Sequence, residues 1–184
     1  MLLFVLALGI PSTAYSQSSF YTYIERCEDI RDDIEEILKE EGLPDYFFYL
    51  ALAESGCDPD NKSEKNALGL FQLVPRTFKA YSKGVCNTDS FDGYCPISSA
   101  YDPLISTRVA AKYLKSLYDR FDGNVDWVIA AFNTGGTNLI KKTSYKKGMN
   151  IKVVKKYYPN AYNLAMTVRR FSILDEALKE DEDS

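Results

Sequence analysis

The sequence predicts a mostly α, single-domain fold on three observations. Apolar residues recur every three to four positions through most of the chain, which is the period of an amphipathic helix. No segment alternates apolar and polar residues as a half-buried strand does, and no Pro- or Ser-rich linker divides the chain. The 184 residues, 46% hydrophobic and 26% charged, suit one globular domain. We assign this domain to residues 17–174.

Residues 1–16 are predicted to be a signal peptide. The run from Met1 to Ile10 is apolar, and small residues follow, with Ala14 and Ser16 at the −3 and −1 positions of a cleavage site. The run is shorter than the roughly 20 residues that span a bilayer. No Lys or Arg precedes it, and an N-terminal helix packed on the domain is the alternative. We expect an exported, periplasmic or envelope-associated protein without stable membrane insertion after cleavage.

The first two helices are predicted to form a hairpin. Residues 26–41 carry apolar side chains at helical spacing, and Gly42 breaks the pattern. Pro44 suits the first turn of a second helix that runs to about Ser55.

Four cysteines, in a chain expected to be exported, predict disulfides. Cys27 and Cys57 each lie roughly 21–24 Å from the turn of the hairpin at about 1.5 Å per residue, so they should meet on adjacent helices. Cys86 and Cys95 would then close a short surface loop. Zinc binding by four thiolates is the alternative, but no C-x-x-C pair supports it.

Three further segments complete the predicted fold. Asp102 and Pro103 begin a helix, as N-cap and first residue, that continues to Phe121. A nearly all-apolar helix spans 125–132, and a last helix spans 162–174. Residues 175–184 hold six acids and are predicted to be a disordered, solvated tail.

The composition restricts the chemistry that the domain can perform. The sequence has no histidine, which excludes Ser-His-Asp and Cys-His nucleophile systems and the common His-containing zinc sites. A carboxylate is then the first candidate for proton transfer. The net charge of −4 argues against non-specific nucleic-acid binding. We expect no cofactor, no metal and no nucleic-acid partner.

Glu54 is the candidate acid. Positions 46–53 are apolar or aromatic on every side, so this helix should be buried all round. Glu54 continues the face of Phe47 and Leu50 and would enter a cleft, where burial raises the pKa of a carboxyl and suits it to general acid catalysis. A Glu at a helix end turned towards solvent is the alternative that periodicity alone leaves open.

The residues that follow Glu54 resemble a known signature. Residues 54–75 carry Glu-Ser at a helix end, a Ser nine residues after the Glu, and then Gly-Leu-x-Gln-x-x-Pro; residues 130–135 read Ala-Ala-Phe-Asn-Thr-Gly. Both resemble motifs of the lytic transglycosylases of the soluble-transglycosylase family, and the branch of membrane-bound lytic murein transglycosylase D looks most similar. The resemblance covers roughly residues 40–170. It implies a lysozyme-like (goose-type) helical domain that acts on peptidoglycan glycan strands.

The resemblance also implies roles for single residues. Glu54 would protonate the bond between N-acetylmuramic acid and N-acetylglucosamine and then act as a base, leaving a 1,6-anhydro end. Substrate-binding roles would fall to Ser55, Phe71, Gln72 and Asn133, to the Tyr162 hydroxyl, and to Gly69 as a tight turn beside the substrate.

Four positions depart from the family pattern. Phe132 stands where Tyr is usual, which removes a hydroxyl. Phe71 and Val74 replace the commoner methionines, or tryptophan at the first, which keeps the groove apolar but alters its shape. Asn66 replaces a frequent Gly and can adopt the left-handed conformation that Gly would adopt.

Two other functions compete with this one. A goose-type lysozyme-like hydrolase would transfer the glycan to water, and a glycosidase of that kind ordinarily needs a second carboxylate. Asp58, Asp60 and Glu64 are the candidates, in a loop that we interpret as solvated. An inactive glycan-binding module of an envelope machine is the other alternative. We expect a monomer in either case.

Overall fold

The protein is described here from a computed structural model over residues 17–86 and 92–182; its regular elements in these ranges are helices joined by loops, and no strand occurs among them. The predicted signal peptide lies outside the described residues. The elements, in chain order, are α1 (Gln17–Glu40), η2 (Asp45–Phe47), α2 (Phe48–Ser55), α3 (Pro75–Tyr81), η3 (Ile97–Tyr101), α4 (Pro103–Arg120), α5 (Val125–Thr134), α6 (Gly136–Thr143), α7 (Lys152–Tyr157) and α8 (Pro159–Glu182).

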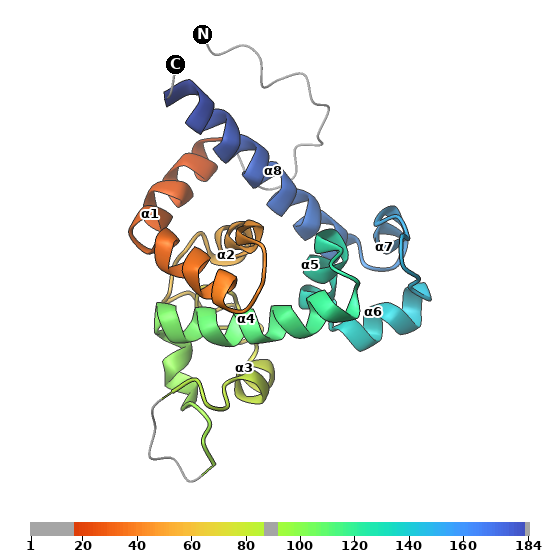
Figure 1. The fold of residues 1–184 in the computed structure, drawn as a ribbon, viewed down its shortest axis with the longest axis horizontal. Helices are drawn as coiled ribbons and strands as arrows, with labels where there is room; N and C mark the ends of the chain where they lie inside the picture. The colour runs from red at the N-terminus through yellow and green to blue at the C-terminus, as the bar shows by residue number, and fades with distance from the viewer. Residues whose placement is uncertain (1–16, 87–91, 183–184) are drawn as a thin grey trace.

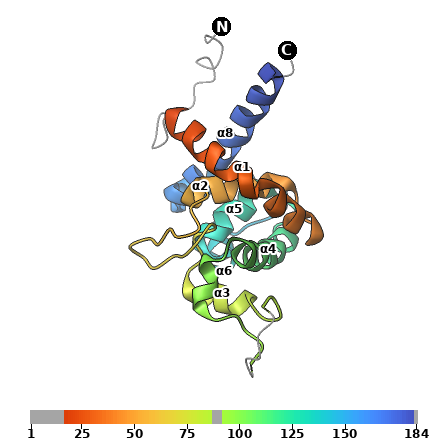
Figure 2. The ribbon, with the colours of Figure 1, turned by 90° about the vertical axis from the view of Figure 1, so that its left-hand side faces the viewer.

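Two short helices occupy the centre of the fold. Figures 1 and 2 show α2 and α5 enclosed by the longer helices α1, α4 and α8. Residues 48–53 of α2 and 127–132 of α5 are all buried, as expected for helices without a polar face. The predicted mostly α class is therefore confirmed, and the helix that carries Glu54 is one of the two central helices.

Local sequence signals set several helix ends. The Asp102 carboxylate accepts hydrogen bonds from the backbone N–H groups of Leu104 and Ile105, at 3.0 and 2.9 Å, as the predicted N-cap of α4. After Pro44 the chain makes one 3₁₀ turn before α2 begins. Helix α1 starts at Gln17, ahead of the predicted residue 26, because the buried Phe20 and Ile24 extend its apolar stripe towards the N-terminus.

Both predicted disulfides are present. Cys27 of α1 is bonded to Cys57, just beyond α2, and Cys86 is bonded to Cys95; in each pair the Cα atoms are 5.4 Å apart. The first pair is almost fully buried, with both residues at 1% exposure or less. It fastens the turn after Glu54 to α1.

Replacing the Cys27–Cys57 pair by alanines should lower the free energy of unfolding by about 3–4 kcal/mol, since the bond closes the longer loop. The same double replacement at Cys86 and Cys95 should lower it by about 2–3 kcal/mol, because a shorter loop restrains the unfolded chain less. Urea denaturation of the two variants measures the difference. A larger loss of stability at the Cys86–Cys95 pair would contradict the expectation that the disulfide closing the longer loop stabilises the protein more.

Residues 175–182 are helical, which corrects the prediction of a disordered tail for the described part of residues 175–184. Helix α8 continues to Glu182, and Leu174 and Leu178 pack against the core. Asp175 is 4% exposed and accepts hydrogen bonds from Arg31 Nη2 at 2.8 Å and from the Tyr49 hydroxyl at 2.7 Å. The first acid of the segment that was predicted to be solvated, Asp175, therefore joins α8 to α1 and α2.

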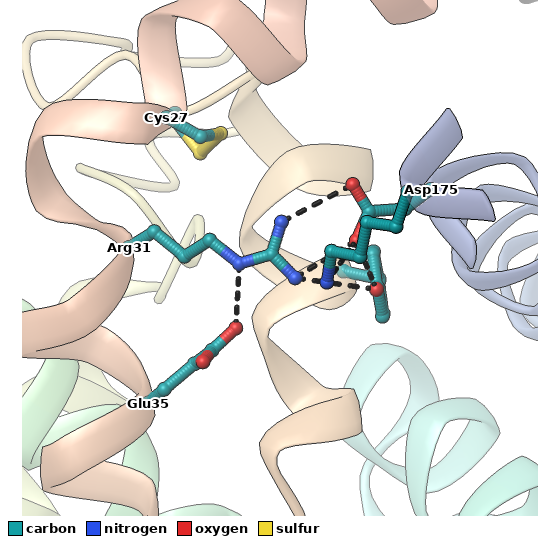
Figure 3. Close-up of polar contacts among 7 residues, drawn as sticks. Cys27, Arg31, Glu35 and Asp175 are labelled. Atoms are coloured by element: carbon teal, nitrogen blue, oxygen red, sulfur yellow. Dashed lines mark hydrogen bonds and ion pairs between the residues drawn. A yellow bond between two sulfur atoms is a disulfide. The ribbon is translucent and has the colours of Figure 1, made fainter. Parts of the chain in front are cut away.

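Figure 3 shows Arg31 at the centre of this contact, between Glu35 on its own helix and Asp175 on α8. Burial alone would raise the pKa of Asp175, but hydrogen bonds from Arg31, Tyr49 and Lys179 lower it to about 2. Asp175 is therefore ionised in the folded protein at neutral pH.

No helix within residues 17–86 and 92–182 is both long and apolar enough to cross a membrane.

Candidate active site

A cleft of about 560 Å³ opens at the end of α2. Its walls come from Glu54, from the loop of residues 63–74, from Tyr113 of α4 and from residues 132–135 at the end of α5. The sequence motifs around Glu54 and Asn133, about eighty positions apart in the chain, therefore face the same space.

Glu54 lies in the last turn of α2 and borders this cleft, as predicted, rather than open solvent. Removal from water raises the pKa of its carboxyl from 4.5 to about 7. Within the described part of the chain, no hydrogen bond or ion pair of this carboxyl opposes the shift. Half of such groups are protonated at neutral pH, so Glu54 can both donate and accept a proton.

The turn after Glu54 is held by α1. Gly56 adopts φ +62, and a Cβ at this position would lie 2.7 Å from Cδ1 of Tyr23. Arg26 Nη1 donates to the Gly56 carbonyl at 3.3 Å, and the next residue, Cys57, is bonded to Cys27. Three contacts from one helix thus fix the backbone on the C-terminal side of the acid.

Gln72 borders the cleft from a strained loop. Its φ is +48, and its Nε2 donates to the carbonyls of Asn61 and Gly69 at 3.1 and 2.9 Å. Those bonds leave the amide oxygen Oε1 as the atom that this side chain can offer to a ligand. Asn66, in the same loop, adopts φ +58, the left-handed conformation predicted for it.

The α5 wall combines an amide with aromatic rings. Asn133 is exposed and borders the cleft one residue after Phe132. The Phe132 ring lies 5.2 Å, between centroids, from that of Tyr113. Glu54, Gln72 and Asn133 are the predicted site residues that the fold brings together.

Two predicted binding residues lie behind the cleft wall. The Ser55 hydroxyl donates to the carbonyls of Leu70 and Ala51 at 2.8 and 3.2 Å and is buried. Phe71 is fully buried in the core. Both residues fasten the loop that carries Gln72, and neither borders the cleft.

Gly69 and Tyr162 are also placed elsewhere. A Cβ on Gly69, at φ +69, would lie 2.1 Å from the Ala100 carbonyl oxygen, so η3 rather than the substrate demands glycine here. Tyr162 borders a different cavity, beside Asp126 and Arg169, under the start of α8. Tyr162, predicted to bind substrate through its hydroxyl, is therefore not among the residues that border the Glu54 cleft.

Tyr113 is the cleft tyrosine that the sequence analysis missed. It sits among the apolar residues of α4 and looked like a core residue. Burial raises the pKa of its hydroxyl to about 12, so it remains protonated. A Cβ on Gly136 would lie 3.0 Å from Leu117 Cδ2, so this glycine lets α6 pack closely against α4.

Glu54 is the only carboxyl bordering the cleft within the described ranges. Asp60 and Glu64 are exposed, and Asp58 accepts a hydrogen bond from the Asp60 N–H at 3.0 Å in the turn after the disulfide. Nor do three or more Asp, Glu or Cys residues gather anywhere in residues 17–86 and 92–182 in a way that could hold a metal ion.

Comparison with known proteins identifies the family to which the chain belongs. The family model described as "Transglycosylase SLT domain" matches residues 34–155. Membrane-bound lytic murein transglycosylase D of Escherichia coli K12 is 31% identical over 115 residues, which are 60% of this chain and 23% of that protein. Soluble lytic murein transglycosylase of the same strain is 30% identical over 90 residues, 49% of this chain and 13% of that protein. The chain thus spans less than a quarter of these two relatives.

Two solved structures share the fold. An inactive variant of the lytic transglycosylase Slt of Pseudomonas aeruginosa superposes with a TM-score of 0.61 at 22% identity, covering 84% of this chain and 23% of that one. The 70 kDa soluble lytic transglycosylase of Escherichia coli superposes with a TM-score of 0.63 at 18% identity, and the match covers 83% of this chain and 28% of that one. With two thirds of its length matched by the family model and its fold shared with two such enzymes, the chain belongs to the transglycosylase SLT domain family.

Proposed function

We propose that this protein is an exported lytic transglycosylase that cleaves peptidoglycan between N-acetylmuramic acid and N-acetylglucosamine. The observation that carries the proposal is a single carboxyl, Glu54, in a cleft where its pKa is raised to about 7. Family membership and the names of the relatives support the substrate class. Gln72 and Asn133 would bind the acetamido or hydroxyl groups of the sugars.

One carboxyl is enough for this reaction. Glu54 donates its proton to the glycosidic oxygen, and the bond between that oxygen and C1 of the muramic acid breaks. The resulting carboxylate then removes the proton of the C6 hydroxyl of the same sugar, whose oxygen attacks C1 and closes the 1,6-anhydro ring. Glu54 ends protonated as it began, and no water is consumed.

A goose-type hydrolase is the competing reaction. Retaining and inverting glycosidases ordinarily place two carboxyls about 5–5.5 or 6.5–9.5 Å apart across the bond that they cut. Asp58, Asp60 and Glu64 do not border the cleft, which disfavours such a pair. An inactive binding module would not need a buried carboxyl whose pKa is raised to about 7.

Mass spectrometry of the fragments released from purified sacculi distinguishes these functions. A transglycosylase releases muropeptides that end in 1,6-anhydromuramic acid, lighter by one water than hydrolysed ones. Reducing ends would show that water is the acceptor and would reject the transglycosylase. Binding to sacculi without release would favour the binding module.

The ionisation of Glu54 predicts how stability depends on pH. Because its folded pKa, about 7, lies above its ordinary value of 4.5, ionisation destabilises the fold. Below pH 4.5 the free energy of unfolding should be nearly the same for wild type and Glu54→Gln. As the pH rises through 7 the variant should become the more stable, by about 1–3 kcal/mol. Urea denaturation at intervals from pH 4 to 8.5 measures the difference.

Glu64→Gln serves as the matched control, because it removes one exposed carboxyl of the same type. Its stability relative to wild type should not change in this pH window. A difference between wild type and Glu54→Gln that stays constant with pH would contradict the raised pKa.

A further inference from the structure

The Glu54 cleft continues into a second hollow. This hollow, of about 350 Å³, shares Tyr113 and Gly135 with the cleft, so the two adjoin. It lies between the end of α3, the outer face of α4 and the first turn of α6. A glycan strand that extends past the cleavage point on this side would meet it.

An aromatic wall runs from the cleft into the hollow. The Tyr113 ring lies 5.2 Å from Phe132 on the cleft side and 4.9 Å from Tyr81 on the far side. The Tyr81 hydroxyl shares a hydrogen bond of 3.0 Å with Ser116 Oγ, which holds that ring in place. The groove therefore has a continuous wall past Tyr113.

The far end of this groove is basic. Arg120 borders the hollow and uses Nη1 to donate to Thr137 Oγ1 at 3.1 Å. Its neighbour in the chain, Asp119, is paired with Lys115, and Arg120 itself has no ion pair within residues 17–86 and 92–182. Most of the guanidinium N–H groups therefore remain available to a ligand.

Two lysines extend this basic end along α6. Lys141 and Lys142 lie four residues after Thr137 and Asn138, so each stands one helical turn beyond a residue that borders the hollow. Both are exposed, and neither has an ion pair with any described residue. We call Arg120, Lys141 and Lys142 the basic rim.

The surrounding sequence does not neutralise the rim. No Asp or Glu occurs between Asp126 and Asp175, a stretch that contains nine Lys and Arg residues in a chain of net charge −4. The acids at the edges of the stretch are engaged: Asp126 with Arg169, and Asp175 with Arg31. The stretch that carries Lys141 and Lys142 is therefore positively charged.

We propose that the basic rim binds the carboxylates of the peptide stem on the glycan strand held in the groove. This inference rests on the proposed function and deepens it, because it makes the substrate a peptide-bearing strand rather than a bare one. Peptide stems present free carboxylates, which match the bidentate guanidinium of Arg120 and the ammonium groups of the two lysines. The aromatic wall contacts the sugars, and the basic rim binds the carboxylates of the peptide stems attached to them.

Binding to the non-cleaving Glu54→Gln protein tests this proposal separately from catalysis. The ligands are soluble glycan oligomers that carry peptide stems, and the same oligomers after an amidase has removed the stems and the lactyl carboxylates left on the sugars have been converted to amides. Calorimetric titration at low salt should show tighter binding of the peptide-bearing oligomers. Adding Arg120→Gln, Lys141→Gln and Lys142→Gln should weaken their binding about tenfold, as expected for a few exposed ion pairs, and should reduce the preference.

A matched triple variant serves as the control. Lys152→Gln, Lys155→Gln and Lys156→Gln remove the same charge from α7 of the same basic stretch, and these residues border neither the cleft nor the hollow. This variant should keep the wild-type preference.

Equal weakening by the two triple variants would show a general charge effect and overturn the rim as a site. Equal binding of both oligomers by the unmodified rim would overturn it as well. A preference that depends on the rim would support it even if product analysis found no anhydro ends, because such a result would reject only the proposed reaction.

Discussion

Glu54→Gln is expected to lower the rate of glycan cleavage by about 10²- to 10⁴-fold, the contribution typical of a general acid and base. The glutamine amide has nearly the same shape but cannot donate a proton to the glycosidic oxygen or remove one from the C6 hydroxyl. The loss should fall on kcat, because the cleft that binds the strand is unchanged. Release of soluble fragments from sacculi, followed over time, measures it.

Two controls accompany this measurement. Glu64→Gln, from the exposed part of the loop, should cleave at the wild-type rate. Thermal unfolding should show that Glu54→Gln is folded and at least as stable as wild type at neutral pH, since it lacks the destabilising charge. A folded Glu54→Gln protein with wild-type turnover would show that another group is the acid.

Asp175→Asn should lower the free energy of unfolding by about 3–5 kcal/mol at pH 7, as expected when one partner of a buried ion pair is removed. The Asp175 side chain is 5% exposed and that of Arg31 18%, so water cannot take the place of the lost carboxylate. The change also weakens the bond that Tyr49 of α2 donates to Asp175. Urea denaturation measures the loss.

The pair Arg108–Glu40 is the matched control. Its side chains are 46% and 51% exposed, so Arg108→Ala should change stability by no more than about 1 kcal/mol. Replacing both partners of the buried pair, Arg31→Met with Asp175→Leu, should restore much of the loss, because no buried charge is then left alone. An Asp175→Asn protein as stable as Arg108→Ala would show that the contact between α1, α2 and α8 is not important for stability.

In the wild type, low pH should remove the stability that ionised Asp175 contributes. The folded pKa of Asp175, about 2, lies below its ordinary value of 3.8. The stability that it supplies is therefore fully present above pH 3.8 and is lost as the pH falls towards 2. In Asp175→Asn this part of the acid sensitivity should disappear.

Features set by neighbours in the chain were predictable from the sequence. The N-cap at Asp102 acts within one turn, and the disulfide of Cys27 with Cys57 follows from two helices that meet at one turn. The apolar helix before Glu54 left both a cleft and a solvent-facing position open for its carboxyl, and the motif that follows in residues 55–75 favoured the cleft.

Features set by distant contacts were not predictable. Tyr113 and Tyr162 both lie on apolar helical stripes, and only the packing of α4 and α8 decides which one borders the cleft. The constraint on Gly69 comes from Ala100, a residue of η3 some thirty positions later. The C-terminal acids looked solvated because the partner of Asp175 is 144 residues away.

The contact between Arg31 and Asp175 has a consequence for the order of events during synthesis. Helix α2, which carries Glu54, packs against α8, and Tyr49 of α2 donates to Asp175. These contacts cannot form on a nascent chain until residue 175 has emerged. A fragment that ends before α8 therefore carries Glu54 on a helix that lacks these contacts. The packing of the helix that carries Glu54 would then be completed late, with the last helix.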